Sequence, residues 1–348
     1  MRIAVDAMGG DHAPAEIVRG AVQGSRLHGV DVVLVGDSDR IARFLPSHTP
    51  PEGVSVHHAS EVIEMGDHVD AVRTKKDASV VVAAALVREG KADAMVSVGN
   101  TAAAMAVATL KLGRIRGIDR PAIATVMPSK TGATIMLDAG AVVDCTPEML
   151  VQFAVMGSVY AEKALGVGNP RVGLLSIGEE KSKGNELTRA AHELLLATGC
   201  TNFIGNVEGR DLFSGNADVI VADGFVGNVA LKTAEGLIDL VKSAIKGAGK
   251  SDPLAWIGGI LMLPGLALAM PFVKRLKKSL DYTEHGGAPL LGIDGVCIIG
   301  HGRSNARAVS SAVRAAKEAV SGGVVEAIRD RVARSVEPAA VPVTEDRM

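Results

Sequence analysis

The sequence predicts a doubly wound α/β sandwich, in which helices cover both faces of a sheet. Short apolar runs alternate with helical segments along almost the whole chain of 348 residues. Hydrophobic residues make up 47% of the chain but aromatic residues only 3%, so small aliphatic side chains must build the core, as in parallel sheets covered on both faces. No repeat or low-complexity linker divides the chain. We therefore expect one α/β domain over residues 1–335, followed by a disordered tail over residues 336–348.

The first part of the chain alternates between buried strands and helices. Strands are expected over residues 2–5, 32–35, 54–58 and 92–98. Helices are expected over residues 15–27, 38–45, 80–88, 102–112 and 147–165. Pro14 suits the start of the first helix, because proline is tolerated in a first helical turn. Residues 122–127 and 134–137 are typical of two adjacent strands around a turn, and we interpret them as an antiparallel insertion.

The second part of the chain continues the same alternation. Strands are expected over residues 172–177, 202–205, 218–222 and 297–299. Helices are expected from Gly184 onwards and over residues 226–245, 304–319 and 324–336.

Composition excludes several classes of function. The formal net charge is −2, so no global field recruits nucleic acid, and we expect no nucleic-acid partner. The three cysteines lack metal-ligand spacing, which predicts buried thiols and no metal site. The N-terminus enters a strand directly and has no signal-peptide pattern, so we expect a cytoplasmic protein.

Four strand ends carry glycine together with polar residues. They lie at residues 6–12, 98–101, 178–186 and 223–228. The carboxyl ends of parallel strands share an edge, so these corners can converge on one cleft. Glycine lets backbone N–H groups approach a ligand, and a helix N-terminus suits an anion. The pattern predicts a phosphate or carboxylate site, and the alternative for each corner is an ordinary solvated loop. The candidate binding residues are Asp6, Gly9, Gly10, His12, Gly99, Asn100, Thr101, Lys181, Glu186, Asp223, Gly224 and Asn228.

Motifs for an enzyme nucleophile, a dinucleotide or a nucleoside triphosphate are missing from the sequence. An anion pocket without a nucleophile suits a reaction in which the anion itself attacks, for example phosphate on an acyl carbonyl. His301 directly follows the last predicted strand and is a candidate proton donor, as are His12 and His285, although a lone histidine is more often structural. Lys183 adjoins the helix start at Gly184.

An uncharged stretch over residues 253–273 is long enough to cross a bilayer as a helix, but Pro264 and Gly265 break it in the middle. We therefore expect a projecting helical hairpin over residues 226–282 with an apolar tip. The cationic cluster that follows suits anionic lipid headgroups, which predicts contact with a membrane surface. The alternative is a dimer interface, and the two are compatible. The tip residues are Trp256, Ile260, Leu261, Leu263 and Leu266.

Several motifs together resemble the acyl-acyl-carrier-protein:phosphate acyltransferase family (PlsX) of bacterial phospholipid synthesis. The matching motifs are Val5-Asp-Ala-Met-Gly-Gly-Asp-His-Ala-Pro14, Gly99-Asn-Thr101, Gly113-Arg-Ile-Arg-Gly-Ile-Asp-Arg-Pro121, Lys183-Gly-Asn-Glu186, Phe203-Ile-Gly-Asn-Val-Glu208, Asp223-Gly-Phe-Val-Gly-Asn-Val229 and Gly286-Gly-Ala-Pro289. The likeness covers about residues 1–335. Ala102, Val142 and Ser176 depart from the usual pattern, which leaves the contacts near the phosphate open.

The resemblance implies a fold like that of isopropylmalate dehydrogenases and a homodimer. It implies transfer of a fatty acyl group from an acyl carrier protein thioester to inorganic phosphate, without a metal or organic cofactor. The acyl phosphate product would then serve glycerol-3-phosphate acyltransferase in phosphatidic acid synthesis. The resemblance also implies peripheral association with the inner face of the cell membrane.

Our hypothesis places phosphate between residues 99–101 and 181–185, with Lys183, Asn185 and His301 as candidate catalytic residues. A metal-dependent hydroxyacid dehydrogenase of the same fold class is the runner-up, and a non-catalytic membrane adaptor is a third alternative. The acidic carrier protein would meet a basic surface. The candidates are Arg73, Lys75 and Lys76 or Arg114, Arg116 and Arg120, and either run also fits a solvated face.

Overall fold

A single mixed sheet runs through the molecule. The computed structural model describes residues 1–248 and 287–336, and within them eleven strands pair in the order β3-β2-β1-β4-β11-β10-β5-β6-β9-β7-β8. The strands are β1 (Arg2–Asp6), β2 (Asp31–Gly36), β3 (Val54–His58), β4 (Ala94–Ser97), β5 (Ala122–Ser129), β6 (Gly132–Leu137), β7 (Arg171–Leu175), β8 (Asn202–Val207), β9 (Val219–Val221), β10 (Ala288–Leu291) and β11 (Val296–Ile299).

The sheet consists of two parallel halves that run in opposite directions. Strands β3, β2, β1, β4 and β11 are mutually parallel, and so are β6, β9, β7 and β8. Three successive antiparallel pairings, β11 with β10, β10 with β5 and β5 with β6, connect them. The expectation that all four polar corners share one edge is therefore wrong, because an odd number of reversals sends the second half the other way.

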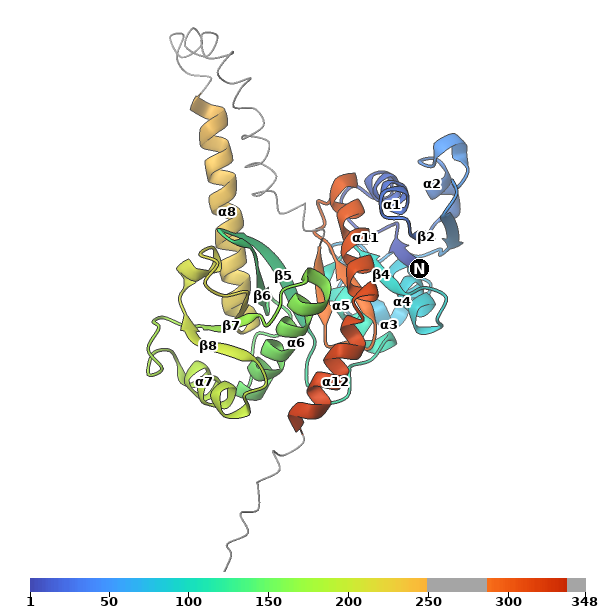
Figure 1. The fold of residues 1–348 in the computed structure, drawn as a ribbon. Coiled ribbons are helices and arrows are strands. Elements are labelled where there is room, and N and C mark those ends of the chain that lie inside the picture. The colour runs from blue at the N-terminus through green and yellow to red at the C-terminus, as the bar shows by residue number, and fades with distance from the viewer. Residues whose placement is uncertain (249–286, 337–348) are drawn as a thin grey trace, which may run out of the picture.

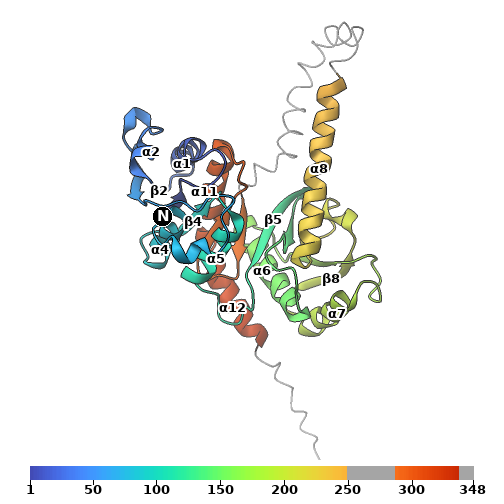
Figure 2. The ribbon, with the colours of Figure 1, turned by 180° about the vertical axis from the view of Figure 1, so that it is seen from behind.

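Helices cover both faces of this sheet, which confirms the predicted three-layer α/β/α architecture (Figures 1 and 2). Helices α1, α6, α7, α11 and α12 pack on one core cluster, and α4, α5 and α8 pack on the other. The helices are α1 (Ala15–His28), α2 (Ser38–Ala42), α3 (Ala71–Thr74), α4 (Ser79–Arg88), α5 (Thr101–Lys111), α6 (Pro147–Leu165), α7 (Glu186–Thr198), α8 (Gly224–Ala248), α11 (Ala306–Ser321) and α12 (Val324–Val336).

Most predicted elements form within a few residues of their expected bounds, with four differences. The short helix α3 was not predicted. Strands β5 and β6 form the predicted antiparallel pair, but they lie in the centre of the sheet rather than in an insertion, because β6 also pairs with β9. Strand β10 was not predicted, because it is only four residues long and contains Pro289. Helix α2 ends at Ala42, before the predicted residue 45.

Helix α8 is the first arm of the predicted hairpin and projects from the body of the protein (Figure 1). The predicted second arm and the tip residues Trp256, Ile260, Leu261, Leu263 and Leu266 lie outside the described residues, as does the tail over residues 337–348. Across residues 1–248 and 287–336, none of the helices combines the length and apolar character that a bilayer crossing requires.

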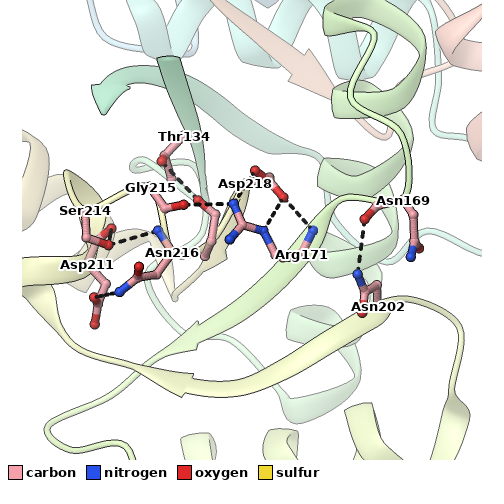
Figure 3. A network of polar contacts seen from close by, with 10 residues as sticks. Thr134, Asn169, Arg171, Asn202, Asp211, Ser214, Gly215, Asn216 and Asp218 are labelled. Atoms are coloured by element: carbon pink, nitrogen blue, oxygen red, sulfur yellow. Dashed lines mark hydrogen bonds and ion pairs between the residues drawn. The ribbon is translucent and has the colours of Figure 1, made fainter. Parts of the chain in front are cut away.

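A polar network holds together the amino-terminal ends of β6, β7 and β9 (Figure 3). The guanidinium of Arg171 donates to both carboxylate oxygens of Asp218, at 3.0 Å and 2.9 Å, and to the carbonyl oxygen of Gly215 at 2.8 Å. Burial acts to raise the pKa of Asp218, but the hydrogen bonds from Arg171 outweigh it and leave the pKa below its ordinary value. The pair therefore fixes the start of β7 against the start of β9.

Replacing Asp218 with Asn should destabilise the protein by about 1–2 kcal/mol at pH 7, since a charge-assisted, partly buried pair is lost. A carboxylate whose pKa is lowered by folding contributes stability above its unfolded pKa of 3.8 and loses it as the pH falls through the lower folded pKa. The difference in free energy of unfolding between wild type and Asp218→Asn should thus be largest at neutral pH and shrink below about pH 4, as measured by urea denaturation.

Asp294→Asn is the matched control, because the Asp294–Arg329 ion pair has both side chains about half exposed. Its cost should stay below about 1 kcal/mol. An equal cost for both variants, or a cost for Asp218→Asn that does not change with pH, would contradict the interpretation.

Candidate active site

A cleft of about 250 Å³ lies where the two halves of the sheet meet. Its floor comes from neighbouring strands and includes Ile123 and Thr125 of β5, Ala288 of β10 and Ile299 of β11. Helix α5 contributes Thr101, and helix α8 contributes Asn228, Leu231, Lys232 and Glu235. Ile123 and Ile299 are buried, whereas Thr101 is exposed. The cleft therefore has an apolar floor and a polar rim.

The rim carries two cationic side chains and a histidine from opposite sides. Lys232 and Asn228 come from α8, whereas His301 and Arg303 come from the loop between β11 and α11. All four are exposed. The Lys232 ammonium lies 2.8 Å from Glu235, one turn further along α8. The structure thus brings together three predicted residues, Thr101, Asn228 and His301, and adds Lys232 and Arg303.

The loop that holds His301 fixes the tautomer of its ring. Nδ1 of His301 accepts a hydrogen bond from the backbone N–H of Arg303 at 3.1 Å, and the Ser304 hydroxyl donates to the His301 carbonyl oxygen at 2.6 Å. A ring nitrogen that accepts a hydrogen bond carries no proton, so the neutral ring carries its proton on Nε2. His301 can therefore donate a hydrogen bond from Nε2 at the rim of the cleft.

Asn100 acts as a clamp rather than as a lining residue. Its carboxamide oxygen accepts from Ala103 N at 3.0 Å and so caps α5, while its amide nitrogen donates to carbonyl oxygens of Met65 and Asp67 at 3.2 Å and 3.0 Å. The cap leaves the first amides of α5, at Thr101 and Ala102, without an acceptor inside the helix. These amides lie at the wall that Thr101 forms, where a helix N-terminus favours an anion.

Asp6 is buried behind this corner. Its carboxylate accepts hydrogen bonds from the hydroxyls of Ser79 at 2.6 Å and Ser97 at 2.7 Å. Burial raises the pKa of Asp6, and the two hydroxyls oppose that rise. Asp6 therefore ties β1 to α4 and β4, and it is absent from the lining of the cleft.

The glycines of the first two corners allow their backbones to pack closely. A Cβ at Gly9 would lie 2.9 Å from Cα of Gly99, and Gly10 has a φ of +100°, which favours glycine. The next residue, Asp11, donates its N–H to the carbonyl oxygen of Gly302 at 2.8 Å. Residues 6–12 thus support the α5 corner and the His301 loop from behind. His12 is exposed and does not line the cleft.

Asp138, which the sequence analysis did not select, organises the other wall. Its buried carboxylate accepts from the backbone N–H groups of Ile123 at 2.9 Å and Val142 at 2.7 Å, and also from those of Gly140 and Ala141. Burial raises the pKa of Asp138, and the four amides oppose the rise. The sequence could have indicated Asp138, because it directly follows a predicted strand and precedes Ala-Gly-Ala.

The start of α8 packs directly on this group. A Cβ at Gly224 would lie 2.6 Å from Oδ2 of Asp138, and a Cβ at Gly227 would lie 1.9 Å from the Asp138 carbonyl oxygen. Asp223 is buried and accepts from Val226 N at 2.9 Å, so it also serves the helix start. These contacts set the position from which Asn228 and Lys232 reach the cleft.

The third predicted corner, residues 178–186, contributes nothing to the lining of this cleft. Lys181, Lys183 and Glu186 are exposed, and Asn185 caps α7 by accepting from Thr188 N at 2.9 Å. The corner follows β7, which is separated from β5 by β6 and β9. The roles proposed for its side chains stay predictions.

Two cysteine thiols and the possible metal-ligand groups bear on the chemistry open to the described part of the chain. Burial raises the pKa of Cys145 to about 11 and that of Cys297 to about 12, so neither thiol is a ready nucleophile. Among residues 1–248 and 287–336, no three His, Cys, Asp or Glu side chains are grouped so that they could hold a metal ion.

Comparison with known proteins identifies the family. Residues 1–327 match the family described as fatty acid synthesis protein. The chain belongs to this family. A phosphate acyltransferase from Desulfitobacterium hafniense is 53% identical over 336 residues, which cover 96% of this chain and 98% of that protein. A phosphate acyltransferase from Nostoc sp. is 51% identical over 334 residues, covering 95% and 96% of the two chains. The family that the motifs predicted, and an acyltransferase activity, are thereby confirmed.

Solved structures with low sequence identity share the fold. A phosphotransacetylase from Streptococcus pyogenes has a TM-score of 0.60 and 17% identity and covers 94% of each chain. A 4-hydroxythreonine-4-phosphate dehydrogenase from Klebsiella pneumoniae has a TM-score of 0.54 and 13% identity, covering 92% of this chain and 99% of that one. Because a transferase and a dehydrogenase both have this fold, the fold alone does not select the activity. Membership of the acyltransferase family decides against the dehydrogenase and adaptor alternatives.

Replacing Gly227 with Ala should lower both stability and turnover, because the new Cβ would collide with the Asp138 carbonyl oxygen and displace the start of α8. We expect a loss of about 1–3 kcal/mol in the free energy of unfolding, the usual cost of overpacking, measured by urea denaturation.

Gly236→Ala is the matched control on the same helix, since a Cβ there meets nothing within 4 Å. It should stabilise the protein by about 0.5–1 kcal/mol through helix propensity. Similar effects from the two substitutions would refute the role given to the contact between Gly227 and Asp138.

Proposed function

We propose that this cleft transfers a fatty acyl group from an acyl carrier protein thioester to inorganic phosphate, which yields acyl phosphate for phospholipid synthesis. The observation that carries the proposal is the meeting of a helix N-terminus, two cations and a histidine N–H donor above an apolar floor. The two substrates supply every atom of the reaction, so it requires no cofactor.

Phosphate would bind between the first turn of α5 and the cations of the rim. The free amides at Thr101 and Ala102 suit its oxygens, and Lys232 and Arg303 supply compensating charge from opposite walls. This placement keeps residues 99–101 from our original hypothesis. In this placement α8 and the His301 loop, rather than the loop over residues 181–185, form the other side of the phosphate site. Lys183 and Asn185 remain the alternative set of catalytic groups.

In the reaction, an oxygen of monohydrogen phosphate forms a bond to the thioester carbonyl carbon. The carbonyl oxygen becomes an oxyanion, which amide or cationic donors of the rim stabilise. The C–S bond then breaks with its electron pair on sulfur, and the Nε2–H of His301 hydrogen-bonds to the charge that develops there. The proton lost by phosphate neutralises the thiolate and gives the free thiol, so charge and protons balance.

The partners follow from this chemistry and from the exposed surface. An acidic acyl carrier protein suits a basic patch, for which Arg73 and Lys76 are exposed candidates, whereas Lys75 is engaged by Asp67 at 2.6 Å. The second candidate run keeps Arg116 and Arg120 exposed, and Arg114 donates to the Asp119 carbonyl oxygen.

A homodimer is supported by the outward face of α8. Phe225, Val229, Leu237 and Leu240 on this helix are all more than half exposed, which is unusual for an isolated helix. We also propose that the protein is cytoplasmic and binds the inner face of the membrane peripherally through the tip over residues 253–273. The acyl phosphate would pass to a glycerol-3-phosphate acyltransferase.

His301→Asn should lower kcat by about 10²- to 10³-fold, since an asparagine can still accept the Arg303 N–H but places no N–H donor at the position of Nε2 to stabilise the leaving sulfur. The measurement is thiol release from palmitoyl-acyl carrier protein at saturating phosphate, with unfolding followed in parallel. His12→Asn, on the adjoining loop, should cost far less. If His12→Asn proves the more damaging variant, His12 rather than His301 is the group that contacts the leaving sulfur.

Lys232→Met should raise KM for phosphate by about 10- to 100-fold, because a charge-assisted contact to the anion is lost. Lys183→Met, which removes an exposed loop charge, should change that KM by less than about threefold. Phosphate titrations of both variants compare the two placements directly. The opposite ranking would return the phosphate to the loop after β7.

A further inference from the structure

The cleft is too small to hold all of a long-chain substrate together with phosphate. Its volume is about 250 Å³, below the range of about 300–1,000 Å³ typical of pockets that enclose drug-sized ligands. Under the proposed function, the thioester and phosphate must occupy the polar rim. Only the first part of an acyl chain can then lie on the floor, and the remainder must leave the cleft along an apolar surface.

Helix α8 supplies such a surface. Leu231 lines the floor of the cleft, and Ala234 follows it one turn later against the same core cluster. Ile238 and Val241 continue the row, because residues spaced by three and four positions share one face of a helix. Ile238 is partly exposed and Val241 is half exposed.

The row continues past the body of the protein. Figures 1 and 2 show that the carboxyl-terminal half of α8 extends beyond the edge of the sheet, so Ile238 and Val241 lie on its projecting part. From Leu231 to Val241 the helix rises about 15 Å, at about 1.5 Å per residue. Glu235 lies beside the row and forms an ion pair with Lys232 at 2.8 Å.

We propose that Leu231, Ala234, Ile238 and Val241 form an acyl track, on which the distal part of a fatty acyl chain lies while its thioester reacts in the cleft. The inference rests on the proposed function and adds the site that makes long chains preferred substrates. The row begins at Leu231, which lines the cleft, so an acyl chain that leaves the cleft meets this face of the helix first. Burial of methylene groups on this face supplies binding energy that short acyl groups cannot use.

The test compares acyl carrier protein loaded with palmitoyl or octanoyl groups, at saturating phosphate. Ile238→Lys should lower kcat/KM for the palmitoyl donor by about tenfold or more, because a charge replaces apolar contact beyond the reach of the short chain. It should leave the octanoyl value within about threefold. Leu231→Phe should lower the ratio of palmitoyl to octanoyl kcat/KM as well, by narrowing the floor where the track begins.

Leu240→Lys is the matched control, because Leu240 is 65% exposed and lies two residues from Ile238, on the outward face of α8. It should change both donors alike, as expected for a face that contacts a second copy of the chain. An unchanged ratio in Ile238→Lys, or an equal change of ratio in Leu240→Lys, would overturn the acyl track. Failure of the proposed function is a separate result, because the wild-type protein would then form acyl phosphate from neither donor.

Discussion

The buried carboxylate of Asp138 is the contact on which the site depends. It accepts hydrogen bonds from the amide at the start of β5 and from three amides that follow β6. Each amide left unsatisfied by its loss would cost about 1–3 kcal/mol. Since Gly224 and Gly227 pack on the same residue, one group fixes the junction of the two sheet halves and the origin of α8. Every contribution of α8 to the cleft follows from that placement.

Both halves of the sheet contribute residues to the cleft. Three antiparallel pairings bring β10 and β5 between two parallel blocks, and the floor is built from the residues around this junction. The first half supplies the α5 terminus and the His301 loop, whereas the second supplies α8. Neither half alone holds both His301 and Lys232, so the proposed chemistry depends on the junction that Asp138 secures.

The periodicity of the sequence predicted most of the fold because strands and helices have distinct hydrophobic repeats. It could not predict strand direction, since β6 is apolar whether its neighbours are parallel or antiparallel to it. Nor could it predict strand order: the Lys183 corner follows β7, which β6 and β9 separate from β5, whereas α8 reaches the cleft and brings Asn228 to the same lining as Thr101. Lys232 was not predicted as a site residue because it lies inside a long helix, away from any turn motif. Thr101, Asn228 and His301 were selected because each lies just beyond a strand end or at a helix start.

Some polar residues at the ends of the strands hold the backbone of the site in place, whereas others line the cleft. Asn100, Asn185 and Asn305 all cap helices through their side-chain oxygens, and Asp6 and Asp138 bind hydroxyl or amide donors of the protein itself. A capping residue satisfies one amide and leaves the first turn free. The motif Gly-Asn-Thr at residues 99–101 thus works by exposing backbone amides, with Asn100 holding them in place. The proposed anion site therefore depends on backbone geometry more than on polar side chains. Ala102 keeps its backbone amide in the first turn of α5, and the Val142 amide binds Asp138 whatever its side chain.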